Sequence, residues 1–269
     1  MSEEIENVVP EYALASAEAR AALDPHLVDA KISKVTVKEA HGSVQVKVTY
    51  LRGTDIHDII YDEKSRKLFC GSEPSAIEDI IARLPGACQR AVREGGPSVS
   101  HIKIKHDDSD GREYVHAHYH ADDGEIISLK LDLDGSDRDA GTDEPREIEH
   151  IIPSYEQLSA GAHAAFDSHL AGVQISQIIQ ANAHGIVETT VVYLRGTEIY
   201  EIIYDETNGK LLGGNEPAVI ETVIDSLPES GQRRVRESGD RFHQLKIKHD
   251  ERDDREYIHV HYIGDEGIW

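Results

Sequence analysis

The sequence predicts an α+β protein of two homologous domains, each made of two units in which a helix precedes a three-stranded antiparallel meander. The main observation is an internal repeat, because the segment Lys103–Asp107 returns unchanged as Lys246–Asp250, an offset of 143 residues. The same offset relates residues 8–119 to residues 151–262 without a gap. The second observation is that helical and strand-like patterns follow one another in the same order in both halves.

The repeat divides the chain into a first domain at residues 1–135, an acidic linker at residues 136–150 and a second domain at residues 151–269. A chain of 269 residues is long enough for two domains with separate cores. The linker is acidic, rich in turn-forming residues and without apolar periodicity, which is typical of a segment that forms no core.

The elements at the start of each domain follow from local patterns. Residues 11–24 are rich in alanine and carry apolar residues at helical spacing, which predicts a helix. Strands are predicted where apolar and polar residues alternate, because one face of such a strand is buried. The first three strands are Lys31–Lys38, Ser43–Leu51 and Asp55–Tyr61, and turn residues follow them.

A pair of helices comes next. Ser72 and Asn215 are predicted N-caps, because an acidic residue and a proline follow each of them. Pro85 and Pro228 should then end the first helix and begin the second. The later strands of the first half are predicted at Val99–His106, Arg112–His120 and Glu125–Leu133.

The strand Glu125–Leu133 has no counterpart in the second half of the sequence. We therefore expect an unprotected sheet edge in the second domain, with unpaired backbone N–H and C=O groups. Such an edge would pair with another copy of the chain to form a homodimer, or residues of the linker would cover it.

Short motifs carry a family resemblance. Tyr204–Leu211 and its copy at residues 61–68 close a meander with a turn, Leu84-Pro85 opens a helix, and Leu131–Gly135 closes another meander. This pattern resembles the PepSY and PepSY-like units of bacterial peptidase propeptides and lipoproteins. Two such units in tandem resemble the cystatin-like α+β fold of β-lactamase-inhibitor-like proteins. The resemblance implies a binding or inhibitory module without catalytic machinery.

Composition excludes several classes of partner. A formal net charge of -23 argues against nucleic acid and against anionic membrane surfaces. No apolar run is long enough for a membrane helix, and the first twenty residues lack the basic and apolar regions of a signal peptide.

Cys70 and Cys88 match Gly213 and Gly231 in the repeat, so no shared disulfide framework is expected. We expect a cytoplasmic protein with two free thiols.

Strand alternation creates a candidate binding surface. If the aliphatic residues of the late strands face the helices, the histidines, tyrosines and lysines between them share the open face of the sheet. In the first half these candidate ligand-binding residues are Lys103, Lys105, Tyr114, His116 and His118, and in the second half they are Lys246, Lys248, Tyr257, His259 and His261.

Histidines at positions i and i+2 of a strand can chelate zinc, copper or nickel if a third ligand comes from another strand. The candidate metal ligands are His116, His118, His120, His259 and His261, with His106 and His249 as further ligands. The competing interpretation is a solvated polar face, because the neighbouring lysines would repel a metal ion.

Acidic turns at residues 106–111, 132–137 and 249–254 suggest Ca²⁺ or another hard cation, although a hairpin turn explains each of them and none has the spacing of a calcium loop.

Arg52 and Arg195 lie in identical Leu-Arg-Gly-Thr segments, which a tight hairpin explains. They could instead anchor an acidic ligand at the end of a strand.

No nucleophile elbow, phosphate loop or zinc finger is present in the sequence. The sequence therefore favours a non-catalytic binding or inhibitory protein, which takes a protein or small-molecule ligand on the exposed sheet faces. The alternatives are a metal-binding protein and a small-molecule enzyme with Tyr, His and Asp acid–base groups.

Overall fold

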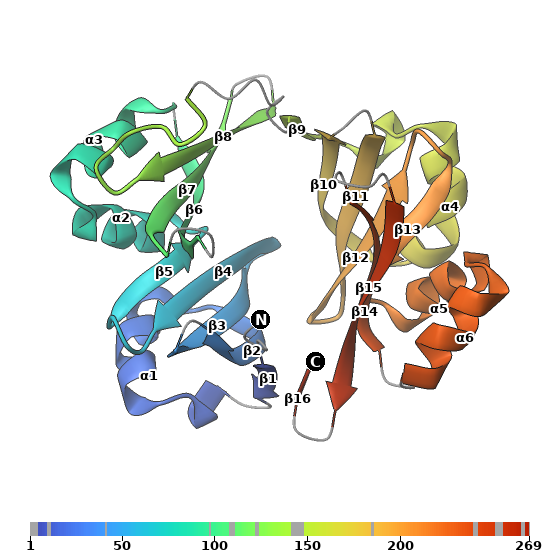
Figure 1. Cartoon of the computed structure of the whole chain (residues 1–269), viewed down its shortest axis with the longest axis horizontal. Coiled ribbons are helices and arrows are strands. Elements are labelled where there is room, and N and C mark those ends of the chain that lie inside the picture. The colour runs from blue at the N-terminus through green and yellow to red at the C-terminus, as the bar shows by residue number, and fades with distance from the viewer. Residues whose placement is uncertain are drawn as a thin grey trace. The chain divides into compact units, whose positions relative to one another are not determined.

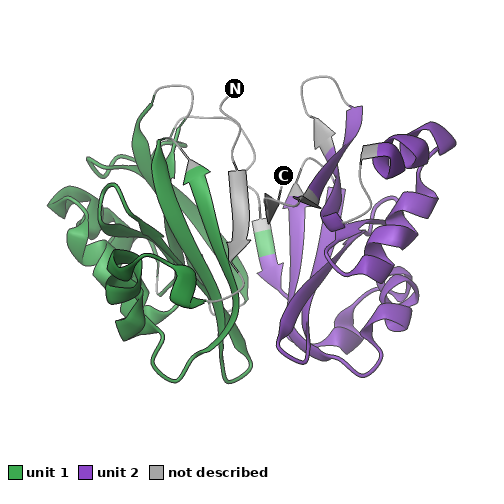
Figure 2. Ribbon diagram, turned by 90° about the horizontal axis from the view of Figure 1, so that it is seen from below, with its two compact units in different colours: residues 1–149 green, residues 150–269 purple. Residues whose placement is uncertain are grey.

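The computed structural model describes residues 5–9, 12–40, 42–96, 98–107, 111–121, 124–140, 148–183, 186–238, 242–250, 255–264 and 267–268. The chain forms two compact units, Met1–Glu149 and His150–Trp269 (Figure 2).

The first unit contains an antiparallel sheet whose strands are neighbours in chain order (Figure 1). These strands are β1 (Ile5–Val9), β2 (Lys31–Ala40), β3 (Ser43–Arg52), β4 (Asp55–Asp62), β5 (Lys67–Gly71), β6 (Val99–His106), β7 (Glu113–His120) and β8 (Glu125–Asp132). The helices are η1 (Tyr12–Leu14), α1 (Ala17–Leu23), η2 (Asp24–His26), α2 (Pro74–Arg83) and α3 (Gly86–Glu94).

The second unit repeats this order. Its strands are β10 (Gln174–Ala183), β11 (Ile186–Arg195), β12 (Glu198–Asp205), β13 (Lys210–Gly214), β14 (Phe242–Asp250), β15 (Arg255–Gly264) and β16 (Gly267–Ile268), and β9 (Ile148–Ile151) lies at the boundary of the two units. Its helices are η3 (Tyr155–Gln157), α4 (Ala160–Leu170), α5 (Pro217–Ser226) and α6 (Glu229–Ser238).

The predicted fold class, an α+β fold with two helix-plus-three-strand units in each domain, is wrong. The structure is rich in strands, and the two groups of strands in the first unit belong to one antiparallel meander, because β5 pairs with β6 through Cys70↔Lys103. The strand β5 was missed by the sequence pattern. It has only five residues, and a register shift opposite Ile60/Tyr61 interrupts the alternation.

Several individual elements agree with the sequence. The strand at Val99–His106 is confirmed, and Pro85 does separate two helices. The predicted N-cap Ser72 is wrong, because the helix α2 has Glu73 at its N-cap and Pro74 as its first residue. The Ser72 hydroxyl instead accepts a hydrogen bond from the backbone N–H of Asp58 at 2.9 Å, because the chain is still extended there.

In both units the helices lie on one side of the sheet (Figure 2). The core of the first unit forms between them, where Val48, Ile59 and Val115 of the sheet are fully buried in the same cluster as Leu23 of α1 and Ile80 of α2. Alternate residues of each strand therefore point to the opposite face, which we call the open face.

In the sheet, β16 follows β15 but is much shorter. Within the described residues, β15 pairs with β14 along most of its length, while β16 pairs with it only at Ile263 and Gly264. The apolar residues of β15 reflect this difference, because Ile258 and Val260 are half-buried whereas their counterparts Val115 and Ala117 in β7 are fully buried.

No helix in the described part of the chain is both long enough and apolar enough to cross a bilayer.

Candidate functional site

The open face of the first unit carries the predicted polar strip. On β7, Val115, Ala117 and Tyr119 are 0% exposed and belong to the core. The residues between them, Tyr114, His116 and His118, are half-buried on the open face. On β6, Lys103 and Lys105 lie on the same open face, because Ile102 and Ile104 are in the core.

Strand pairing adds His101 and Cys70 to this strip, and the sequence did not place either residue in a candidate site. The register pairs His101 with His118 and Lys103 with His116. The ring centroids of His101 and His118 are 5.5 Å apart, and those of His116 and His118 are 4.4 Å apart. Cys70 of β5 lies 3.0 Å from Nε2 of His101, measured from Sγ. We call His101, His116 and His118 the histidine cluster.

The histidine cluster is uncharged at neutral pH. Burial, and then repulsion from His118 when that ring is protonated, lower the pKa of His101 to about 4. Burial, and then Lys105, lower the pKa of His116 to about 3. Burial and Lys105 also lower the pKa of His118. Three adjacent imidazoles among lysines would repel one another if they were protonated, so the cluster is held together in its neutral form.

Within the described residues, no group of three His, Cys, Asp or Glu side chains is placed so that it could hold a metal ion. His116 Nε2 instead lies 2.5 Å from the Ser128 hydroxyl on the adjacent strand β8. His120 and His106 lie exposed at the ends of their strands, and the side chain of His249 is outside the described residues.

The second unit has a related but more exposed strip. The rings of His259 and His261 have centroids 4.6 Å apart, and Tyr257 is 47% exposed. Burial and then Lys248 lower the pKa of His259. Lys246 is engaged inside the unit, because its ammonium lies 3.0 Å from the carboxylate of Glu188.

Arg52 and Arg195 occupy equivalent positions at the ends of β3 and β11, where each forms an ion pair inside its unit. Arg52 Nε lies 2.6 Å from the Glu73 carboxylate, which also accepts a hydrogen bond from Tyr50 at 2.6 Å. The equivalent Arg195 lies 2.9 Å from Glu216. Each arginine therefore ties the end of a strand to the N-terminus of a helix.

Asp107 and Asp132, from two of the acidic turns, are held by contacts inside the first unit. Arg138, from the predicted linker, lies 2.8 Å from Asp107 and 3.3 Å from Asp132. Its guanidinium also stacks 4.5 Å from the ring centroid of Tyr114. Residues 108–110 and 251–254 of the predicted cation turns lie outside the described residues, as do residues 141–147 of the linker.

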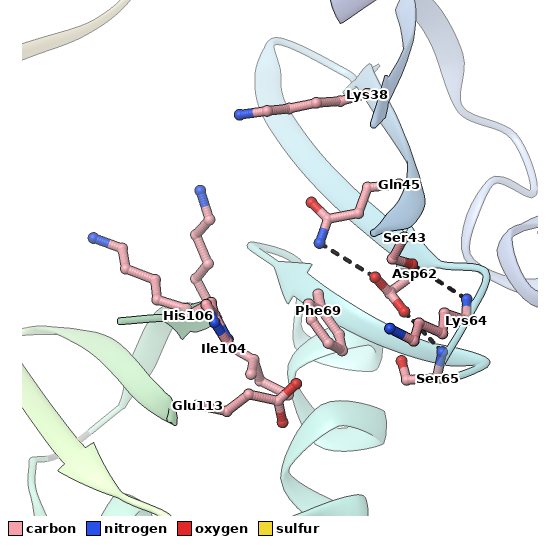
Figure 3. A pocket seen from close by; sticks show the side chains of 12 residues that line it. Lys38, Ser43, Gln45, Asp62, Lys64, Ser65, Phe69, Ile104, His106 and Glu113 are labelled. Carbon is pink, nitrogen blue, oxygen red and sulfur yellow. Dashed lines mark hydrogen bonds between the residues drawn. The ribbon is translucent and has the colours of Figure 1, made fainter. Parts of the chain in front are cut away.

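A pocket of about 530 Å³ lies at the end of the first unit's sheet, where β6 approaches the turn between β4 and β5. Figure 3 shows Phe69 between two walls, with Gln45 and Asp62 on one side and His106 on the other. The ionisable groups of the pocket, besides His106, are four lysines and two carboxylates: Lys38, Lys64, Lys103, Lys105, Asp62 and Glu113. Among these lining residues, the sequence singled out Lys103 and Lys105 as ligand-binding candidates and His106 as a further metal ligand. Most of the others come from distant strands and turns of the sheet.

Comparison with known proteins finds no family model that matches the chain and no curated protein of significantly similar sequence. The resemblance to PepSY-like units therefore stays a prediction based on the short motifs.

Proposed function

We propose that this protein is a non-catalytic binding protein that takes a ligand on the open face of its first unit. The observation that supports this most is the pocket of about 530 Å³ that adjoins the strip of lysines and histidines. Ligand sites in proteins are usually concave, and they combine an apolar surface with a few polar groups that converge on it. Phe69 and Ile104 supply such an apolar surface, and Lys103 and Lys105 supply donors on a rigid strand.

Binding is favoured over catalysis by the chemistry of the buried thiol. A cysteine acts as a nucleophile only as the thiolate. Burial raises the pKa of Cys70 to about 12, so the group beside His101 is a protonated thiol at neutral pH. Cys70 and Cys88 are both free and buried. Two unpaired thiols support a reducing compartment such as the cytoplasm, and the net charge of -23 supports a partner other than nucleic acid.

A thermal-shift screen tests the proposed site. The protein is heated with small polar molecules of negative, neutral and positive charge, and ligands that raise the melting temperature are then tested on Lys103→Gln/Lys105→Gln. We expect this variant to lose the stabilisation by the ligand, because the change removes two positive charges of the pocket while keeping side chains of similar length.

The matched control is Lys246→Gln/Lys248→Gln, which makes the same change at the repeated positions of the second unit. This control should keep the full ligand effect. Ligands that stabilise wild type and both variants equally would show that the open face of the first unit is not the site.

Self-association is a second property that we propose, through the side of β15 that β16 covers only at Ile263 and Gly264 among the described residues. An edge strand offers backbone N–H and C=O groups to another chain. Two copies that pair antiparallel at this edge would form a symmetric dimer and would cover Ile258 and Val260. We expect light scattering to report a dimer at micromolar concentration, and a constant monomer mass over a wide concentration range would contradict this expectation.

A further inference from the structure

The pocket has an excess of positive charge, whereas the chain as a whole has a large negative net charge. Four lysines face two carboxylates in the pocket, whereas the chain carries a net charge of -23. One of the carboxylates, Asp62, is only 3% exposed. Burial opposes its ionisation, but hydrogen bonds from Ser65, Ser43 and Gln45 outweigh burial and hold the pKa of Asp62 below its usual range. Asp62 is thus satisfied mainly by neutral donors rather than by the lysines.

Two lysines of the pocket, Lys64 and Lys103, have no acidic partner among the residues that the structure describes. Among the described residues, no carboxylate lies within ion-pair distance of the ammonium groups of Lys64 and Lys103. The side chain of Gln45 faces the pocket and donates a hydrogen bond to Asp62 at 3.3 Å (Figure 3). Like charges gathered in a concave surface raise the local concentration of counter-ions, because the surrounding protein screens them less than water does.

In the second unit, the lysine that corresponds to Lys103 is neutralised by a carboxylate of the protein. Glu188 stands where the first unit has Gln45, and its carboxylate lies 3.0 Å from the ammonium of Lys246, the counterpart of Lys103. Ala181 and Thr207 stand in place of Lys38 and Lys64, which removes two positive charges. The second unit therefore keeps this lysine, as Lys246 of β14, and the protein itself supplies the negative partner, Glu188.

We infer that the pocket of the first unit binds a small polyanion with two or more carboxylate or phosphate groups, and that the second unit lacks this activity. The inference rests on the proposed function and names its class of ligand. A pocket of about 530 Å³ has room for a molecule of metabolite size. Lysines act as separate point charges and not as the planar fork of an arginine, so they suit several anionic oxygens at a distance from one another.

Calorimetric titration tests this inference with three probes: citrate, inorganic pyrophosphate and the neutral sugar glucose. The two anions distinguish carboxylate ligands from phosphate ligands. Wild type should bind at least one anion at one site per chain, more weakly at high salt, and should not bind glucose. The variant Gln45→Glu/Lys64→Thr carries the residues of the second unit, and we expect its affinity for the anion to fall at least about tenfold, about 1.4 kcal/mol.

The reverse variant, Ala181→Lys/Glu188→Gln/Thr207→Lys, should add a second anion site to the chain, because its two new lysines complete a set of four with Lys246 and Lys248. Equal anion binding by wild type and Gln45→Glu/Lys64→Thr would overturn the inference. If only neutral molecules stabilise the protein and Lys103→Gln/Lys105→Gln removes their effect, the proposed function stands and the anion inference fails. If no probe and no molecule of the screen binds, both fail.

Discussion

Replacing Gly213 with alanine is expected to destabilise the second unit by about 3 kcal/mol, because no space exists for a side chain at this position. A Cβ atom built on Gly213 would lie 2.2 Å from the carbonyl oxygen of Leu245 and 2.8 Å from the Cα of Lys246. Both atoms belong to the backbone of β14, the strand that pairs with Gly213. The backbone of β14 cannot move aside without breaking its pairing with β15.

Thermal unfolding followed by circular dichroism measures this effect, and a loss of about 3 kcal/mol should lower the melting temperature of the unit by roughly 10 °C. The matched control is Gly86→Ala in the first unit. Nothing lies within 4 Å of a Cβ at Gly86, the first residue of α3, so alanine should be neutral or stabilising there. A melting temperature of Gly213→Ala within one degree or so of wild type would contradict the close approach of β13 and β14.

Acid is expected to destabilise the first unit between about pH 6.5 and about pH 4, through the histidine cluster. The pKa of His101 is about 4 in the folded protein, against about 6.5 for an exposed histidine. Between these two values the unfolded chain binds more protons than the folded chain, so stability falls as the pH falls. For His101 the loss approaches about 3 kcal/mol when the pH reaches 4.

His116 and His118 should add to this loss, but less than their separate shifts suggest, because neighbouring imidazoles titrate together. Urea unfolding at about pH 7 and about pH 4.5 measures the loss. The variant His101→Gln removes the titrating group and copies Gln244, which the second unit carries at the repeated position. We expect the variant to lose about 2 kcal/mol less than wild type over this pH range, and an equal loss would show that His101 is not the group responsible.

The positions of the helices and most strands could be read from local patterns. The alternation in β7 depends only on the two-residue period of a strand, so it separates Val115 from His116 without any knowledge of the partners. Pro85 likewise separates α2 from α3, because a proline lacks the backbone N–H that a continuing helix needs. The gapless repeat also indicated that both halves follow one order of elements.

Which strands pair, and in which register, was not available from such patterns. The five-residue strand β5 joins the early and late strands into one meander, and its alternation is broken by a register shift. The predicted fold class was wrong for this reason. Local periods describe each strand alone, whereas a sheet is held by hydrogen bonds between strands that are distant in the chain.

The candidate site depends on the same long-range pairing. Alternation placed Lys103 and His116 on an open face, but His101 joins His118, and Cys70 joins His101, only through the registers of β5, β6 and β7. The pocket likewise combines residues from β2 to β7, among them Lys38 and Lys64. The roles of Arg52 and Arg195 as internal clamps depend on Glu73 and Glu216, about twenty residues away in the chain. A residue's neighbours along the chain set the direction of its side chain, whereas its contacts and charge environment arise only when distant strands come together.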